Sequence, residues 1–159
     1  LKGNHSMTYP IIKTFGQKLP EITYTDREGA YLIVIRDGKL ATTKAPKGHY
    51  LPGGGIMENE SHHDCIIREA REETGFEVMV GEYLCTADKY WKNGDKGYFH
   101  PIQTYYIGEI SEVVGTPTES DHRLVWLKID IAIHQMYSEM QRWAIQMAIN
   151  GNNSAKSQE

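Results

Sequence analysis

The stretch GGIMENESHHDCIIREAREETGF, residues 54–76, decides how the rest of the chain is organised. Ser61 is a residue type that caps helix N-termini, and Asp64 three positions later completes a shortened capping box. Gly75 supplies the left-handed residue with which many helices end. The sequence therefore predicts one short helix between Ser61 and Gly75, preceded by a glycine-rich turn.

Acidic residues gather on one side of this predicted helix. At about 100° per residue, Glu69, Glu72 and Glu73 fall within an arc of roughly 100°. Like charges at these spacings repel one another unless a cation lies among them. A hard divalent cation such as Mg²⁺ prefers oxygen ligands and is usually shared with substrate phosphates. The alternative, a solvent-exposed helix laced with Arg–Glu pairs, explains neither the glycines nor the spacing.

The same stretch resembles the signature of the Nudix hydrolase family. That signature reads Gly, five residues, Glu, seven residues, Arg-Glu, an aliphatic residue, any residue, Glu-Glu, any residue, Gly and an aliphatic residue. Every fixed glycine and polar position is filled, by Gly54, Glu60, Arg68, Glu69, Glu72, Glu73 and Gly75. Ala70 and Phe76 replace the expected Ile, Leu or Val, and because both are apolar the departure concerns packing alone.

The resemblance implies a role for each of these positions. The implied ligands of Mg²⁺, for which Mn²⁺ is an expected substitute, are Glu69, Glu72, Glu73 and the backbone carbonyl of Gly54 or a neighbour. Arg68 is expected to orient the carboxylates through charge-assisted hydrogen bonds. Glu60 is expected to support the loop and the metal-bound waters.

The sequence leaves the general base open. In some members of the family the base is the first Glu of the Arg-Glu pair, which here is Glu69. In others it is a carboxylate from a later loop, for which Glu119 and Asp121 are the candidates. We favour Glu69, because an acidic residue in a loop is usually only solvated. Histidine is the residue type whose charge changes near neutral pH, and His122, beside Asp121, is a further candidate but equally well explained as a surface histidine.

Residues outside the signature are candidates for contacts with the substrate. Lys44 and Lys47 lie in a polar loop, residues 44–50, where they would meet phosphate oxygens or remain solvated. Glu119 and Asp121 are further candidates. Aromatic side chains cluster at a predicted hairpin tip, and either stack on a base or pack across the strands: Tyr90, Trp91, Tyr98 and Phe99.

The resemblance implies a Mg²⁺-dependent hydrolase. Its substrate would be a nucleoside diphosphate linked to another group, as in nucleotide sugars, dinucleoside polyphosphates and nucleoside triphosphates. A sanitising enzyme for oxidised nucleoside triphosphates differs only in substrate. The alternative of another class is a nucleotide-sensing module without hydrolysis; such relatives typically lack one of the glutamates, whereas all are present here.

Length and composition favour one globular domain without a membrane or nucleic-acid partner. The chain has 159 residues and a formal net charge of −4, which gives no attraction to bulk nucleic acid or an anionic membrane. No run of 18 or more apolar residues predicts a membrane span. Cys65 and Cys85 form no metal motif or disulfide framework, so we expect a reducing compartment and a cytoplasmic location. Members of the family form homodimers, and the sequence leaves the oligomeric state open.

The order of the predicted elements indicates an α+β fold. We expect strands at 30–35 and 40–43 joined by an Asp37-Gly38 turn, further strands at 76–80, 82–90, 98–110 and 124–127, and a helix over 136–149 ended by Gly151. The family resemblance implies more, an α/β/α sandwich around a mixed β-sheet. Residues 1–6 are interpreted as an expression-tag remnant, 7–151 as the single domain and 152–159 as a disordered tail.

Overall fold

The computed structural model describes residues 9–156, with side chains described up to residue 152. The predicted tag remnant lies outside the described residues. The strands are β1 (Lys13–Gly16), β2 (Thr25–Ile33), β3 (Ile35–Arg36), β4 (Lys39–Ala45), β5 (Gly48–Tyr50), β6 (Gly53–Gly55), β7 (Phe76–Lys92), β8 (Tyr98–Val113) and β9 (Arg123–Lys128). The helices are α1 (His62–Thr74), the 3₁₀ turn η1 (Gly94–Lys96), α2 (Ile129–Gln135) and α3 (Glu139–Lys156).

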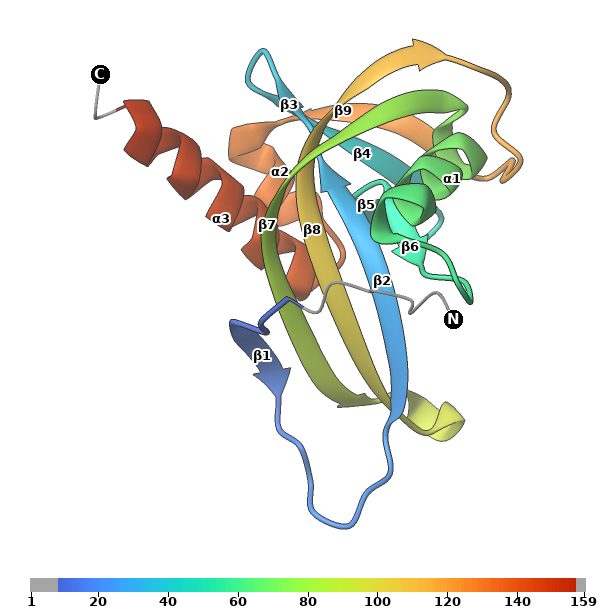
Figure 1. The fold of residues 1–159 in the computed structure, drawn as a ribbon, viewed down its shortest axis with the longest axis vertical. Coiled ribbons are helices and arrows are strands. Elements are labelled where there is room, and N and C mark those ends of the chain that lie inside the picture. Colours follow the sequence, from blue (N-terminus) through green and yellow to red (C-terminus); the bar gives the residue numbers. More distant parts are fainter. Residues whose placement is uncertain (1–8, 157–159) are drawn as a thin grey trace, which may run out of the picture.

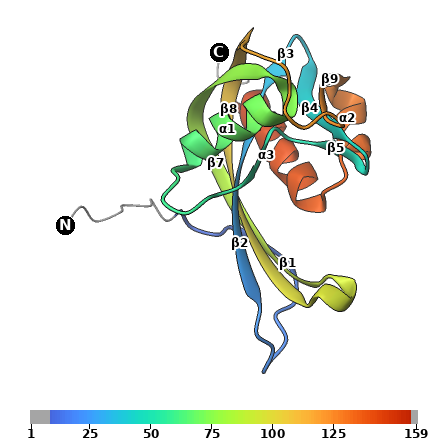
Figure 2. The same cartoon turned by 90° about the vertical axis from the view of Figure 1, so that its right-hand side faces the viewer.

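A mixed five-stranded sheet forms the middle layer, in the order β1-β7-β8-β2-β6. The β1–β7 and β2–β8 pairs are parallel, and the β7–β8 and β2–β6 pairs are antiparallel. A second sheet joins β3, β4, β5 and β9. Helix α1 lies on one side of the main sheet and α3 on the other, as Figures 1 and 2 show together. The predicted α+β fold and mixed sheet are confirmed.

Both faces of the last part of β2, residues 30–33, are covered, as the apolar run 30–35 predicted, whereas β2 starts earlier than predicted, with exposed residues at 25–28, and ends at Ile33. Ala30 and Leu32 pack with Cys65 and Ile66 of α1 in one buried cluster. Ile33 packs with residues of β4, β8 and α3 in a second cluster. The chain then turns at Asp37-Gly38, where both residues have positive φ, 51° and 73°, as a type I′ hairpin requires. This strand therefore holds the two helical layers in place.

Helix α1 begins and ends where the sequence predicted. The Ser61 side chain accepts a hydrogen bond from the Asp64 backbone N–H at 3.1 Å. Gly75 takes the left-handed conformation, with φ 76°, and its N–H donates to the Arg71 carbonyl. The helix buries Cys65, Ile66 and Ala70 against the sheet. Its opposite side is thereby left for the charged residues.

Two sequence-based predictions about the strands were wrong in detail. The strands predicted at 76–80 and 82–90 form one strand, β7, with register shifts near Val80 and Tyr83. Gly81 lies within the register shift between Val80 and Tyr83 and does not interrupt the strand, since a glycine inside a strand often marks a bulge. The segment 44–50 is a short hairpin between β4 and β5 instead of a loop.

The C-terminal region also differs from its prediction. The helix predicted over 136–149 begins at Glu139, and the separate helix α2 was missed because it has only 7 residues. Gly151 does not end α3, since it lacks the positive φ of a helix stop. Residues 152–156, expected in a disordered tail, therefore continue α3. No helix within the described part of the chain is long and apolar enough to cross a membrane.

Candidate active site

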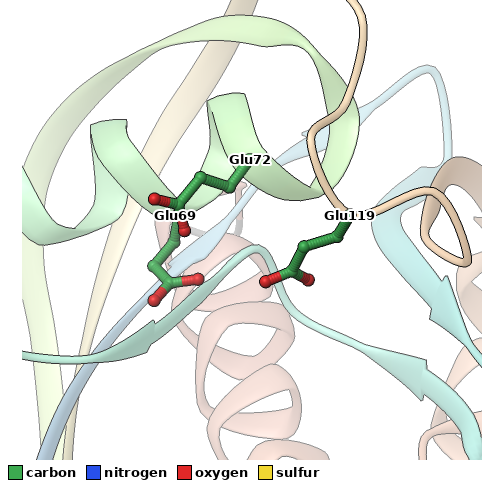
Figure 3. A group of neighbouring side chains, drawn as sticks. All are labelled: Glu69, Glu72 and Glu119. Carbon is green, nitrogen blue, oxygen red and sulfur yellow. The ribbon is translucent and has the colours of Figure 1, made fainter.

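Three carboxylates converge beside the outer face of α1. Glu69 and Glu72 come from α1, and Glu119 comes from the loop between β8 and β9 (Figure 3). One carboxylate oxygen of each residue lies within 4.8 Å of the others. The carboxylates of Figure 3 point toward one another. The arrangement thus concentrates negative charge at a single point.

The loop that carries Glu119 is anchored on the C-terminal end of α1. The last carbonyls of a helix have no partner within the helix. Here the Glu119 N–H donates to the Glu72 carbonyl at 3.0 Å, and Val114 and Gly115 donate to the Gly75 carbonyl. These bonds hold the loop against the helix, so the Glu119 side chain reaches the carboxylates of α1.

Arg68 links the glutamates of the signature. Its Nε and Nη2 donate to the two oxygens of Glu60 at 2.7 and 3.0 Å. Its Nη1 donates to Glu69 at 3.0 Å and to Glu72 at 3.2 Å, and Nη2 also reaches the Gly55 carbonyl. The hydrogen bond from Arg68 lowers the pKa of Glu60. One planar guanidinium therefore fixes the orientation of three carboxylates, as fork-shaped donors do.

Glu73 is the most buried of the signature acids, with 7% of its surface exposed. Its Oε1 accepts a hydrogen bond from the Gly53 N–H at 3.1 Å. Burial, followed by the charges of Glu69, Glu119 and Glu72, raises the pKa of Glu73 to about 9. Burial likewise raises the pKa of Glu69, against the effect of Arg68. The acidic side chains of the site therefore repel one another, and the charge of Arg68 does not offset this repulsion completely.

This donor set fits a divalent cation. Carboxylate oxygens are the ligands that Mg²⁺ prefers, and one to two carboxylates plus substrate phosphates usually suffice. A positive ion among Glu69, Glu72 and Glu119 would offset the repulsion that their proximity creates. Because these oxygens lie within 4.8 Å of one another, small side-chain movements would allow Glu69, Glu72 and Glu119 to hold one ion together.

A cavity of about 410 Å³ opens beside the carboxylates. Glu69, Glu73 and Glu119 line it, together with Lys47 and His122. His122 Nε2 lies 3.2 Å from Glu119. The cavity thus brings signature acids, a loop acid and one cation into contact with the same space.

Two of the residues singled out from the sequence lie elsewhere. The Lys44 ammonium donates to the Ala45 carbonyl at 3.2 Å, and Lys44 is not among the residues that line the cavity. The Asp121 side chain is 62% exposed and pairs with His122 Nδ1 at 2.7 Å. Of the predicted pairs, Lys47 and Glu119 therefore reach the cavity, whereas Lys44 and Asp121 do not.

The sequence reasoning missed Tyr31 and Tyr50, which also line the cavity. Tyr31 lies near the C-terminal end of β2, opposite Gly53. Its alternation with Ala30 and Leu32 was a signal that its side chain faces away from α1. Tyr50 carried no such signal, because β5 was expected to be a loop.

Gly54 passes very close to the carboxylate of Glu69. A Cβ atom at position 54 would lie 2.6 Å from the Glu69 carboxyl carbon, and the Gly54 carbonyl accepts a contact from Cys65 Sγ at 3.4 Å. A glycine at this position thus allows the strand β6 to approach α1. The role of the Gly54 carbonyl as a metal ligand stays a prediction.

We expect Gly54→Ala to lower kcat by about 10- to 100-fold, because small displacements of catalytic groups have effects of this size. The unfolding free energy should change by less than about 1 kcal/mol, since the displaced group is the end of a flexible side chain. Steady-state kinetics and urea denaturation measure the two effects. Gly55→Ala is the matched control, because its Cβ would meet nothing closer than 4.0 Å. Equal kcat values for the two variants would contradict this account of Gly54.

Comparison with known proteins identifies the family and agrees with the fold. The NUDIX domain model matches residues 22–146, and the chain therefore belongs to the Nudix hydrolase family, as the signature predicted. Over 60 residues the chain is 35% identical to the CTP pyrophosphohydrolase of Escherichia coli (strain K12). That alignment covers 34% of this chain and 44% of the relative, which is less than half of its length.

Solved structures of the family share the fold. A Nudix hydrolase from Nitrosomonas europaea superimposes with a TM-score of 0.66 at 18% identity, covering 80% of this chain and 90% of that one. A MutT Nudix hydrolase from Burkholderia pseudomallei superimposes with a TM-score of 0.61 at 23% identity, covering 77% and 98%. At these identities the likeness concerns the fold alone. The predicted α/β/α sandwich is confirmed.

Proposed function

We propose that this chain is a Mg²⁺-dependent pyrophosphohydrolase that cleaves the diphosphate linkage of a nucleoside diphosphate derivative. The observation that carries the proposal is the convergence of Glu69, Glu72 and Glu119 within 4.8 Å. It is supported by the adjoining cavity of about 410 Å³, a volume typical of small-molecule sites. Carboxylates that hold a metal next to such a cavity suit a phosphate-bearing substrate.

Different side chains bind the metal, orient the carboxylates and bind the phosphates. When bound, Mg²⁺ on Glu69, Glu72 and Glu119 supplies charge neutralisation and acidifies a water molecule. Arg68 holds two of these carboxylates in place. Glu73 and the Gly54 carbonyl remain the further ligands that the signature implies. Lys47, on the cavity wall, binds phosphate oxygens as a point charge.

The reaction itself needs one proton acceptor. A water oxygen forms a bond to phosphorus, the bridging P–O bond breaks, and the water proton passes to a carboxylate. Glu69 is our first candidate and Glu119 the second, because both line the cavity. Asp121 is the weakest candidate, since its side chain is largely exposed and paired with His122.

The compounds to be screened as substrates are chosen from those that the family resemblance implies and from the name of the relative. CTP is included because the E. coli relative is described as a CTP pyrophosphohydrolase. Nucleotide sugars, dinucleoside polyphosphates, other nucleoside triphosphates and oxidised nucleoside triphosphates complete the panel.

A hydrolysis screen with Mg²⁺, with Mn²⁺ and with EDTA tests the proposal. We expect metal-dependent release of a nucleoside monophosphate from at least one member of the panel, and none with EDTA. Binding of nucleotides without any turnover would instead identify a sensing module. Neither binding nor turnover across the whole panel would overturn the proposal.

A further inference from the structure

A second and larger hollow adjoins the carboxylate cavity. It has a volume of about 680 Å³ and lies between the sheet and the start of α3. Tyr31 and Tyr50 line both hollows, so the two hollows meet at these side chains. We call the larger one the α3 groove. A molecule held at the carboxylates therefore lies next to the α3 groove.

Two glutamines line the α3 groove, one from each wall. Gln103 comes from β8, and Gln141 comes from the first turns of α3. Gln141 is 1% exposed, so its amide is a buried polar group that needs hydrogen-bond partners. In the register of the sheet Gln103 lies opposite Gly29, two residues from the Tyr31–Tyr105 pair, which is about 7 Å along the strand. Gln103 is thus close to the junction of the two hollows.

The protein fixes which end of each amide faces the groove. The Tyr105 hydroxyl donates to Gln103 Oε1 at 2.6 Å, and the Leu51 backbone N–H donates to Gln141 Oε1 at 2.8 Å. A backbone N–H only donates, and the buried Tyr105 hydroxyl donates to no other group among residues 9–152. Burial raises the pKa of Tyr105 far above its usual value, so the hydroxyl keeps its proton. Both amide oxygens are therefore committed to the protein.

The two Nε2 groups remain as donors for a ligand. Neither Nε2 has a hydrogen-bond partner within the described part of the chain, and both residues line the α3 groove. Each Nε2 carries two N–H bonds and accepts nothing. Aromatic side chains line the same space, among them Tyr31, Tyr50 and Tyr137. The ring centroids of Tyr50 and Tyr137 are 5.5 Å apart, and those of Tyr31 and Tyr105 are 5.9 Å apart. Such a combination suits a planar ring whose edge carries acceptor atoms.

We propose that the α3 groove binds the base of the nucleotide substrate and that Gln103 and Gln141 donate hydrogen bonds to its carbonyl and ring-nitrogen acceptors. This inference rests on the proposed function, because it assumes that the diphosphate lies at the carboxylates. It implies a preference for bases that carry a carbonyl group. Adenine is disfavoured, because its exocyclic group is an amino donor that would face these donors.

A matched pair of ligands tests the preference. Inosine and adenosine nucleotides share the N7 acceptor of the purine and differ at position 6, where inosine has a carbonyl and adenosine an amino group, and at the adjoining N1, which is a donor in inosine and an acceptor in adenosine. We expect inosine monophosphate to bind at least about tenfold more tightly than adenosine monophosphate, as hydrogen-bond recognition of this kind allows. Calorimetry in EDTA measures this binding without metal or turnover. The same order should hold for kcat/KM on the two triphosphates with Mg²⁺.

Gln103→Glu tests the assignment of the donors. The variant keeps an oxygen for the Tyr105 hydroxyl, so we expect it to fold, and it replaces the Nε2 donor by an acceptor. The inosine-to-adenosine binding ratio should fall toward one, and KM for the inosine nucleotide should rise about 10- to 100-fold, more than kcat falls. Gln146→Glu is the control, because Gln146 lies on α3, is exposed, bonds to Asn150 and does not line the α3 groove.

The outcomes separate the inference from the proposed function. Equal or tighter binding of adenosine monophosphate, or a ratio in Gln103→Glu that equals that of Gln146→Glu, would overturn the base assignment. Mg²⁺-dependent turnover of base-free ribose 5-triphosphate by the unaltered protein would still support the hydrolase. If no triphosphate is cleaved while the inosine preference persists in binding, the hydrolase fails and the groove still binds bases.

Discussion

Glu72→Gln should lower kcat by about 10²- to 10³-fold, the range seen when one charge-stabilising group is removed from a preorganised site. Glu72 contributes one of the three converging carboxylates, and glutamine keeps its shape while it removes the charge. The loss should fall on metal affinity as well as on turnover, because fewer anionic ligands remain. Kinetics at saturating nucleotide over a Mg²⁺ titration, together with Mn²⁺ binding followed by electron paramagnetic resonance, measure the two effects.

The fold should survive this substitution. The substitution removes the ion pair between Arg68 and Glu72, in which the Glu72 side chain is 34% exposed. It also removes one negative charge from a group of like charges. We therefore expect the unfolding free energy to change by less than about 1 kcal/mol. Glu112→Gln is the control, because Glu112 is exposed on β8, away from the carboxylates. Wild-type kcat and metal affinity in Glu72→Gln would remove Glu72 from the metal site.

Glu119→Gln should have the second-largest effect, a loss of about 10²-fold in kcat. Its carboxylate belongs to the converging group, although the residue lies outside the signature. Asp121→Asn makes the same chemical change in the same loop, and we expect no more than about a threefold effect because the Asp121 side chain is 62% exposed. Parallel kinetics on the preferred substrate of the screen compare the two variants.

The reverse order of effects would be equally informative. A large loss in Asp121→Asn with a small loss in Glu119→Gln would mean that the loop rearranges when substrate binds. It would also move the proposed site away from the carboxylates of Figure 3. Thermal denaturation of both variants should stay close to that of the unaltered protein, since neither backbone hydrogen bond of Glu119 involves its side chain.

Local sequence signals were sufficient for α1 and the first hairpin. The cap at Ser61, the stop at Gly75 and the turn at Asp37-Gly38 each depend on residues only a few positions apart. Such interactions form within a segment and are therefore visible in its sequence. The apolar run 30–35 also predicted a strand that is buried on both faces.

Local signals failed where neighbouring segments decided the outcome. Gly81 looked like a break between two strands, but pairing with β8 continues on both sides of it. Gly151 looked like a helix stop, but a glycine in helical conformation lowers helix stability by only about 1 kcal/mol. The helix α2 had no side-chain cap to mark its start. In each case the conformational preference of a single residue contributed less free energy than the contacts with neighbouring segments.

By itself, the sequence determined the family, the helix and the row of glutamates along one side of it, because these follow from spacing within 23 residues. Only the tertiary structure decided which other groups meet those glutamates. Glu119 reaches them because its loop satisfies the free carbonyls at the end of α1, whereas Lys44 and Asp121 bond elsewhere. The α3 groove likewise exists only in three dimensions, since its two glutamines lie on β8 and α3, and distant segments meet only when the core closes.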